Sequence, residues 1–260
     1  MNYNDMFDRN IGVFTKEEQS KLKGKKIGIM GCGGMGGISA QIVARTGIES
    51  MILADPEKFE VVNINNQFTA FKTTIGENKA KVTAKMVSAI NPEINLEIYD
   101  EGLTDKNVEN IVKSVDIIFD CIDYNALYYS YILNKSTRRE GKYVLAPQAI
   151  GYGASVLVFD PNGLSFNEYI GLNDNMSKEQ IDNFIVTPEK YAPIIPSYID
   201  KEIMQKVVNK SIPIPNIALA QTLATSIMVS EAIIILLNKR KPITVPNVIA
   251  IDLLENKYLS

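Results

Sequence analysis

The sequence predicts an α/β fold in which a mostly parallel sheet carries helices on both faces. The apolar strand 25–31 runs into the glycine-rich loop Gly31-Cys32-Gly33-Gly34-Met35-Gly36-Gly37, and a helix at 38–47 follows it. The next apolar stretch, 50–55, ends in a carboxylate, and strand and helix patterns alternate from there to about residue 159. A strand, a glycine loop, a helix and a second strand form the opening unit of a Rossmann-type nucleotide-binding fold.

The elements of the first half follow from capping and periodicity. A capping-box pattern, Thr15 with Glu18, predicts a short helix over 14–23, and the helix at 38–47 stops at Gly47. Apolar side chains on one face predict a helix at 76–92, which Pro92 ends. The other expected elements are a loop with short helical turns at 56–76, a strand at 94–102, a helix at 104–114, a buried strand at 115–123, a helix at 125–141, and strands at 142–148 and 151–159.

The amino-acid composition changes after Asp160. Residues 161–213 are rich in Asn, Pro and Tyr and have weak periodicity, as expected of a crossover or lid segment. Its Tyr169, Tyr191 and Tyr198 could line a substrate groove or simply pack. Residues 216–238 predict a helix that is apolar on nearly all sides, buried and suited to a subunit interface, and 245–260 predicts a strand with a tail. We therefore expect an antiparallel C-terminal extension of the sheet, and we divide the chain into a nucleotide-binding part, 1–160, and a crossover, interface-helix and strand part, 161–260.

Composition narrows the possible functions. The 260 residues are 46% hydrophobic and 22% charged, with a net charge of −3, which fits a soluble globular protein and disfavours a general nucleic-acid-binding role. There is no histidine, and the two cysteines form no CxxC pair, so we expect neither a four-thiolate zinc site nor a histidine relay. The most apolar stretch, 227–237, is too short to span a membrane, and the polar N-terminus shows no signal peptide, so we expect a cytoplasmic protein.

The residues after the second strand distinguish ATP from NAD. The run from Asp55 to Gln67, DPEKFEVVNINNQ, resembles the D-x-D-x-V-x-x-x-N-L-x-R-Q pattern of the ThiF/MoeB/HesA family, the bacterial relatives of ubiquitin-activating enzymes. Three further matches follow the order of that family. They are Gly76 with Lys79 for a G-x-x-K element, Asp120 with Asp123 for D-x-x-D, and Arg9 for the arginine of an N-terminal Y-x-R-Q segment.

The resemblance implies that a substrate carboxylate attacks the α-phosphorus of ATP to give an acyl adenylate and pyrophosphate. It implies catalytic roles for Arg9, Lys79 and Asp123, with Asp123 holding Mg²⁺ and Arg9 coming from the partner subunit of a homodimer. The expected nucleotide-binding residues are Gly31, Gly33, Gly34, Gly36, Asp55, Glu57, Asn63, Asn66, Gln67 and Lys79. The acyl substrate would be a peptide or small-protein C-terminus, a side-chain carboxylate or amide, or a small acid.

The sequence departs from the family pattern at two points. Asn66 replaces the arginine of N-x-x-R-Q, and loss of a charge-assisted bond to phosphate costs roughly ten- to hundredfold in rate. Arg138, Arg139 or a lysine could supply the missing charge. No cysteine lies after Asp160, so we expect no covalent enzyme intermediate, and we expect Cys32 and Cys121 to be small packing residues.

Other interpretations stay open. Lys79 could be a solvated lysine, Asp123 could cap the next helix, Asn63 could stabilise its own turn and Arg9 could be a surface residue. Tyr131 and Lys135 have the spacing of a dehydrogenase pair, which would indicate a nicotinamide-dependent oxidoreductase. Loss of the arginine at position 66 also allows a nucleotide-binding scaffold without turnover.

Overall fold

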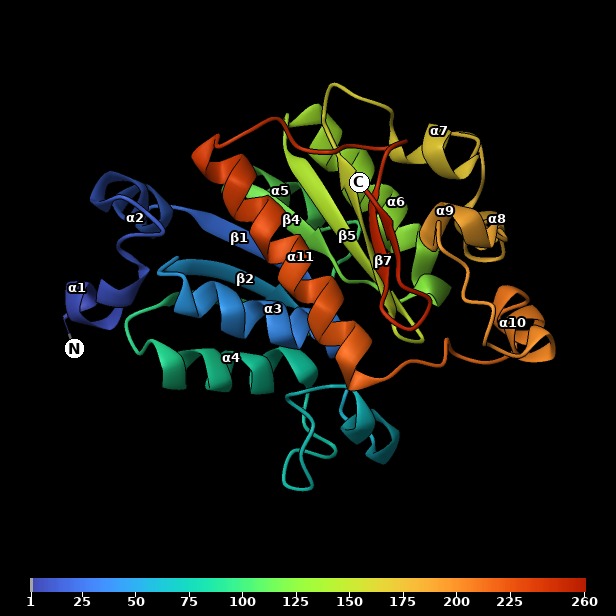
Figure 1. The fold of residues 1–260 in the computed structure, drawn as a ribbon, viewed down its shortest axis with the longest axis horizontal. Helices are drawn as coiled ribbons and strands as arrows, with labels where there is room; N and C mark the ends of the chain where they lie inside the picture. The colour runs from blue at the N-terminus through green and yellow to red at the C-terminus, as the bar shows by residue number, and fades with distance from the viewer. Residues whose placement is uncertain (1) are drawn as a thin grey trace.

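A computed structural model describes residues 2–260, and its strands form one continuous sheet (Figure 1). The strand order is β3-β2-β1-β4-β5-β6-β7-β8. The first five strands in this order are parallel, and the last three add to them by antiparallel pairing. The predicted fold class is therefore confirmed. The strands are β1 Lys26–Met30, β2 Ser50–Ala54, β3 Asn95–Tyr99, β4 Ile117–Asp120, β5 Tyr143–Ile150, β6 Gly153–Phe159, β7 Ile249–Asp252 and β8 Lys257–Leu259.

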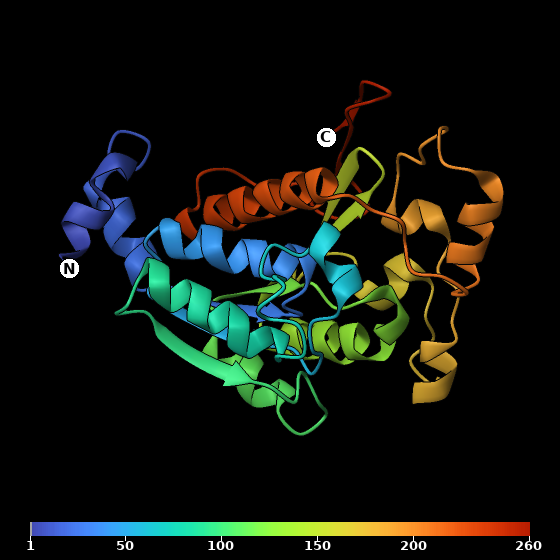
Figure 2. The same cartoon turned by 90° about the horizontal axis from the view of Figure 1, so that it is seen from below.

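Helices cover both faces of the sheet (Figure 2). On one face α3 packs between α4 and α11, and on the other α5 packs against α6. Each helix turns its apolar side inward because burying that side removes it from water. The layer helices are α3 Gly34–Arg45, α4 Lys79–Ile90, α5 Val108–Ser114, α6 Leu127–Arg139 and α11 Ala218–Leu237, with the short 3-10 turns η2 Val61–Asn65 and η3 Tyr124–Ala126.

The N-terminal segment lies at the carboxyl end of α3. It contains α1 Tyr3–Met6, the 3-10 turn η1 Asp8–Asn10 and α2 Lys16–Lys23. The capping box predicted at Thr15 is present at the start of α2. The Tyr3 hydroxyl donates to the Gly47 carbonyl at 2.7 Å, and Gln19 Nε2 donates to the Thr46 carbonyl at 2.9 Å. These bonds hold the segment at the end of α3 that is remote from the glycine loop.

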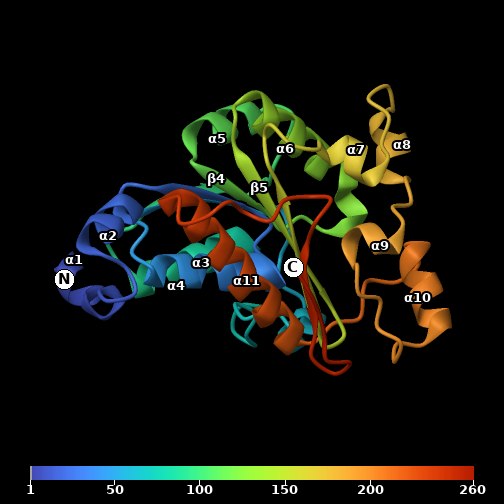
Figure 3. The same ribbon diagram turned by 45° about the horizontal axis from the view of Figure 1, so that its top comes forward.

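The crossover segment is more structured than its composition indicates (Figure 3). It folds into α7 Phe166–Ile170, α8 Lys178–Asp182, α9 Pro188–Tyr191 and α10 Lys201–Val208. Phe166, Tyr169 and Ile170 are buried in a cluster with side chains of α6, β5 and β6. Because β6 also pairs with β7, the main sheet continues across the boundary we drew at residue 160.

The C-terminus differs from the single strand we expected. It forms a hairpin of β7 and β8, because the chain reverses through a turn in which Glu255 N donates to Asp252 Oδ1 at 2.8 Å and Asn256 adopts a left-handed φ of 55°. The preceding helix α11 lies within the 216–238 range expected for it. Its 20 residues are long and apolar enough to cross a membrane by length and composition, and in the fold it packs against α3, β5 and β6.

The turn from β1 into α3 is the tightest contact of the sheet's carboxyl edge. A Cβ added at Gly36 would lie 1.8 Å from the Gly31 carbonyl oxygen, and one at Gly31 would lie 2.2 Å from the Cys121 carbonyl oxygen. Gly31 also has a left-handed φ of +92°. Only glycine lets helix, loop and neighbouring strand approach this closely.

We therefore expect Gly36→Ala to lower the free energy of unfolding by about 3 kcal/mol, because the backbone must separate to admit the methyl group. Chemical denaturation monitored by circular dichroism measures the change. Gly24→Ala is the matched control. Its added Cβ would meet no atom closer than 3.8 Å, so we expect a change within about 1 kcal/mol. Equal stabilities for the two variants would contradict the role assigned to Gly36.

Candidate functional site

Asp55 links the ends of two parallel strands at the carboxyl edge. Its Oδ2 accepts a hydrogen bond from the backbone N–H of Cys32 at 2.6 Å, and its Oδ1 accepts one from Glu57 N at 2.8 Å. The carboxylate is 5% exposed, and burial raises its pKa despite these donors. Asp55 therefore fixes the glycine loop after β1 relative to the segment after β2.

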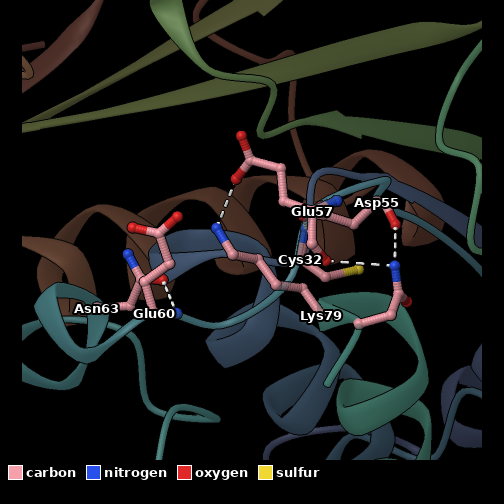
Figure 4. Close-up of polar contacts among 7 residues, drawn as sticks. Cys32, Asp55, Glu57, Glu60, Asn63 and Lys79 are labelled. Atoms are coloured by element: carbon pink, nitrogen blue, oxygen red, sulfur yellow. Dashed lines mark hydrogen bonds and ion pairs between the residues drawn. The ribbon is translucent and has the colours of Figure 1, made fainter. Parts of the chain in front are cut away.

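Lys79 lies beside this carboxylate at the first position of α4. Asn78 caps the helix by accepting from Lys81 N at 3.0 Å, so the lysine is held on a rigid element. Its side chain is 6% exposed, and its Nζ donates to Glu57 Oε2 at 2.6 Å (Figure 4). Glu57 is 64% exposed and can rotate into solvent. The interpretation of Lys79 as a solvated lysine is thus wrong, since its side chain is buried and paired with an exposed carboxylate.

Asp120 and Asp123 have different environments at the end of β4. Asp120 is buried and accepts hydrogen bonds from Ser130 Oγ at 3.0 Å and Asn134 Nδ2 at 3.2 Å. Burial raises the pKa of Asp120 to about 6, and these donors oppose the shift only in part. Asp123 is exposed and caps η3 by accepting from Asn125 N at 2.8 Å. The two carboxylates therefore serve different purposes, and only Asp123 faces solvent.

Turn η2 and the two residues after it bring polar side chains to the same edge. Asn63 Oδ1 accepts from Glu60 N at 2.9 Å. Asn63 therefore stabilises its own turn, which is one of the two roles that the sequence allowed for it. Asn66, at the position of the family arginine, donates through Nδ2 to Asn216 Oδ1 just before α11. The Gln67 side chain lies against Gly33, where an added Cβ would meet its Oε1 at 3.5 Å.

Arg9 does not reach this cluster within one chain. It lies on η1, and the next residue of this turn, Asn10, donates to the Thr46 carbonyl at the carboxyl end of α3. The glycine loop is at the other end of this 12-residue helix, about 18 Å away by helix geometry. Arg138 and Arg139 also point elsewhere, to the Gly163 carbonyl and to Glu109. None of the three arginines replaces the missing charge within one chain.

The crossover segment contributes side chains that the sequence did not identify as a group. Tyr191 of α9 packs edge-on against Tyr124, with ring centres 5.4 Å apart, and burial raises its pKa, with Asp120 adding to the shift. Lys210 lies over the Tyr124 ring at 5.0 Å and donates to the Asp182 carbonyl. Burial lowers the pKa of Lys210, while Asp182 and Asp123 act to raise it. The crossover therefore covers the end of β4, and only its tyrosine content indicated this beforehand.

The remaining tyrosines and the cysteines have structural environments. Tyr169 donates to the Lys190 carbonyl at 2.8 Å inside the buried cluster, and Tyr198 donates to Asp252 Oδ2 at 2.8 Å. Lys135 Nζ is 3.2 Å from the Tyr131 hydroxyl, but Tyr131 is buried among the apolar side chains of that cluster. Burial raises the pKa of Cys32 and of Cys121 well above the usual range, which disfavours a thiolate at either position.

The fold and the site together define a Rossmann-type α/β protein with polar residues at the carboxyl edge, where the strand order switches between β1 and β4. Comparison with known families makes this specific. The model of the ThiF family matches residues 7–260, so the chain belongs to the ThiF family. The resemblance found in the sequence is thereby confirmed.

Known relatives match the chain in part. A tRNA threonylcarbamoyladenosine dehydratase of Haemophilus influenzae is 32% identical over 123 residues, covering 47% of each chain. The sulfur carrier protein ThiS adenylyltransferase of Escherichia coli is 26% identical over 143 residues, covering 55% of this chain and 56% of the relative. These matched segments span about half the length of the curated relatives. A crystal structure of E. coli MccB with ATP superposes with a TM-score of 0.71 at 21% identity, over 98% of this chain and 71% of that one, and shows likeness of fold.

The buried Asp120 carboxyl yields a pH-dependent prediction. Its pKa in the folded protein, about 6, exceeds the usual value near 4, so the folded state binds this proton more tightly than the unfolded state. The contribution to stability is present below about pH 4 and is lost as the pH rises through about 6. Asp120→Asn removes this dependence. We expect the variant to gain up to about 3 kcal/mol relative to wild type between pH 4 and pH 7.

Denaturant unfolding of both proteins across this pH range measures the difference. The exposed Asp5, changed to Asn, serves as the control and should track wild type at every pH. A constant offset between Asp120→Asn and wild type would show that the Asp120 carboxyl titrates alike in the folded and unfolded chains.

Proposed function

We propose that this protein catalyses ATP-dependent adenylation of a substrate carboxylate or carboxamide. In the carboxylate case, an oxygen of the substrate attacks the α-phosphorus of ATP, an acyl adenylate forms and pyrophosphate leaves. The observation that carries the proposal is the placement of the buried Lys79 and Asp55 at the edge of the glycine loop. Phosphoryl and nucleotidyl transfer depend mainly on positioning and charge neutralisation, which such a rigid cluster supplies.

Each residue has a definite task in this proposal. The glycine loop admits the phosphates close to its backbone, and the start of α3 offers N–H donors. Asp55 holds the ribose hydroxyls while it keeps its bonds to the loop. Lys79 neutralises phosphate oxygens after Glu57 yields its place, which the exposure of Glu57 permits. Asn63, Gln67 and Asn66 form the wall of the nucleotide site beside α11.

Asp123 suits a magnesium ion. It is an exposed carboxylate at the carboxyl edge, and Mg²⁺ is commonly held by one or two carboxylates together with substrate phosphates. Within residues 2–260 no group of three His, Cys, Asp or Glu side chains is arranged as a metal site, so phosphates and water must complete the shell. The ion would neutralise phosphate charge, while Asp123 orients it.

The acyl substrate proposed is a peptide or small-protein C-terminus, bound under the crossover segment. A relative is named as the adenylyltransferase of the sulfur carrier protein ThiS, and crystal structures of MccB include one with MccA. With both thiols disfavoured as thiolates, the adenylate would pass directly to an acceptor rather than to an enzyme cysteine.

A homodimer completes the site in this proposal. Arg9 lies at the wrong end of α3 to serve its own chain's nucleotide, so a second copy must bring it. Apolar side chains near the site are also left exposed, with Val61 at 70% and Val62 at 72%. A self-complementary interface over η2 would bury them.

We expect ATP–pyrophosphate exchange in the presence of Mg²⁺ and peptides that carry a free C-terminal carboxylate or carboxamide. Lys79→Ala and Asp123→Ala should each lower the exchange rate at least tenfold to hundredfold, because a charge-assisted contact to phosphate or metal is lost. Radiolabelled pyrophosphate incorporated into ATP gives the rate.

Lys72→Ala on the exposed surface is the control and should leave exchange unchanged. The alternatives have separate signatures. A scaffold would bind ATP and exchange nothing with any peptide. An oxidoreductase would bind NAD(H) tightly and depend on Tyr131, a result that the burial of Tyr131 disfavours.

Mixing two inactive variants tests the shared site. In a dimer of one Arg9→Ala chain and one Lys79→Ala chain, one site keeps both wild-type residues and the other loses both. An equimolar mixture after subunit exchange should therefore recover about a quarter of wild-type exchange activity. Light scattering should give twice the chain mass. Mixtures as inactive as the separate variants, with exchange of subunits verified, would place Arg9 outside the site.

A further inference from the structure

Three buried polar atoms surround the start of α3 without a hydrogen-bond partner in the described part of the chain. They are Gln67 Oε1, Thr69 Oγ1 and Gln221 Oε1. Each lies against a glycine of the loop. Cβ atoms added at Gly34 and Gly37 would meet Gln221 Oε1 at 2.6 Å and Thr69 Oγ1 at 2.9 Å, respectively. Buried polar groups are ordinarily paired, so three unpaired atoms around one helix end need an explanation.

The start of α3 is itself short of partners. The helix has 12 residues and begins after Gly33, whose position provides no side-chain cap among residues 2–260. Its first N–H groups point out of the helix and carry a partial positive charge. An anion at this position would satisfy both the helix end and the neighbouring side chains.

Gln221 is the member of this group that lies farthest from the sequence motifs quoted for the family. It comes from the first turns of α11, more than 180 residues beyond the loop, and is 5% exposed. Thr225, one helical turn on, donates to the Gln221 carbonyl at 2.8 Å, and its hydroxyl lies 3.4 Å from the Met35 carbonyl in the first turn of α3. The pair Asn66–Asn216 fastens the chain just before α11 to the segment after η2. Gln221 is therefore held firmly against the loop.

We propose that Gln221 is a ligand-binding residue that donates a hydrogen bond to an anionic oxygen held at the start of α3. The carboxamide can turn about its last bond so that Nε2 replaces Oε1, since the two ends have nearly the same shape. The anion is a phosphate oxygen of the nucleotide or the carboxylate of the acyl substrate. The inference rests on the proposed adenylation for the identity of these ligands, but the anion site itself does not depend on turnover.

A purely structural role for Gln221 predicts different stabilities. Methionine has nearly the same volume and lacks the polar group, so Gln221→Met removes a buried polar atom without a partner and should leave the ligand-free protein as stable as wild type or more so. A packing or water-bridging role predicts a lower melting temperature. Gln205→Met, on the exposed side of α10, is the matched control.

Ligand binding is tested with inorganic pyrophosphate, acetate, ATP and adenosine, each added to the full chain in EDTA. Calorimetry or the ligand-induced rise in melting temperature gives the affinity. If the anion is a phosphate, Gln221→Met should weaken pyrophosphate and ATP binding about tenfold, and Gln221→Glu should weaken it further by like-charge repulsion. Adenosine, which has no phosphate, should bind both variants as it binds wild type.

Binding of acetate tests whether the anion is instead the carboxylate of the acyl substrate. Loss of acetate-induced stabilisation in Gln221→Met, with pyrophosphate binding intact, assigns the contact to the substrate carboxylate. Wild-type affinity of Gln221→Met for both anions overturns the inference, as does a lower melting temperature of its ligand-free form. Failure of the proposed function looks different, because then wild type shows no pyrophosphate exchange while the dependence of anion binding on Gln221 persists.

Discussion

The contact between the first turn of α3 and the Gly31 carbonyl oxygen sets where the glycine loop and the start of α3 lie at the carboxyl edge of the sheet. With no side chain at Gly36, the helix starts directly on the end of β1, and its N–H groups open onto the carboxyl edge of the sheet. Asp55 then needs only one bond, to Cys32 N, to join the loop to β2. Lys79 follows because α4 begins beside Glu57, whose carbonyl accepts the Lys79 N–H at 2.9 Å. Backbone hydrogen bonds and helix starts thus position the charged side chains of Asp55 and Lys79.

Much of the fold could be predicted because its signals are local. The glycine loop, the capping box at Thr15 and the carboxylate at Asp55 each depend on neighbours in sequence, and each lies where the patterns indicated. The hairpin of β7 and β8 was missed because its turn uses Asn256 at positive φ, without the glycine that commonly marks such a turn. The crossover helices were missed because they have only four to eight residues, and α7, α8 and α9 pack into a cluster shared with α6 and β5.

The site divides in the same way. Asp55 and Glu57 were found from one contiguous motif and Lys79 from the next one along the chain, and the fold needs only one βα unit to gather them. Asn216, Lys210 and Gln221 were not found, because their roles depend on how a long crossover returns to the sheet. A signal for Gln221 was nevertheless present. Together with Thr225 it puts two polar residues one turn apart at buried positions of a mostly apolar helix, and such a pair on a buried face has to meet a polar partner.

The replacement of the family arginine by Asn66 has a physical consequence for this arrangement. An arginine would hold a positive charge near the phosphates of the proposed nucleotide. Asn66 instead donates its side-chain amide to Asn216, and this bond joins the end of the crossover segment to the segment after η2. Asn66 therefore lacks the positive charge of arginine, but its bond to Asn216 helps to fix the position of α11. Fixing α11 also fixes Gln221 against the glycine loop. Neutral carboxamides bind anions more weakly than a guanidinium does, but held rigidly they lose little conformational entropy on binding. In the proposed adenylation, the rigid α11–loop contact offsets the missing arginine at a site where Lys79 is the only buried cation among residues 2–260.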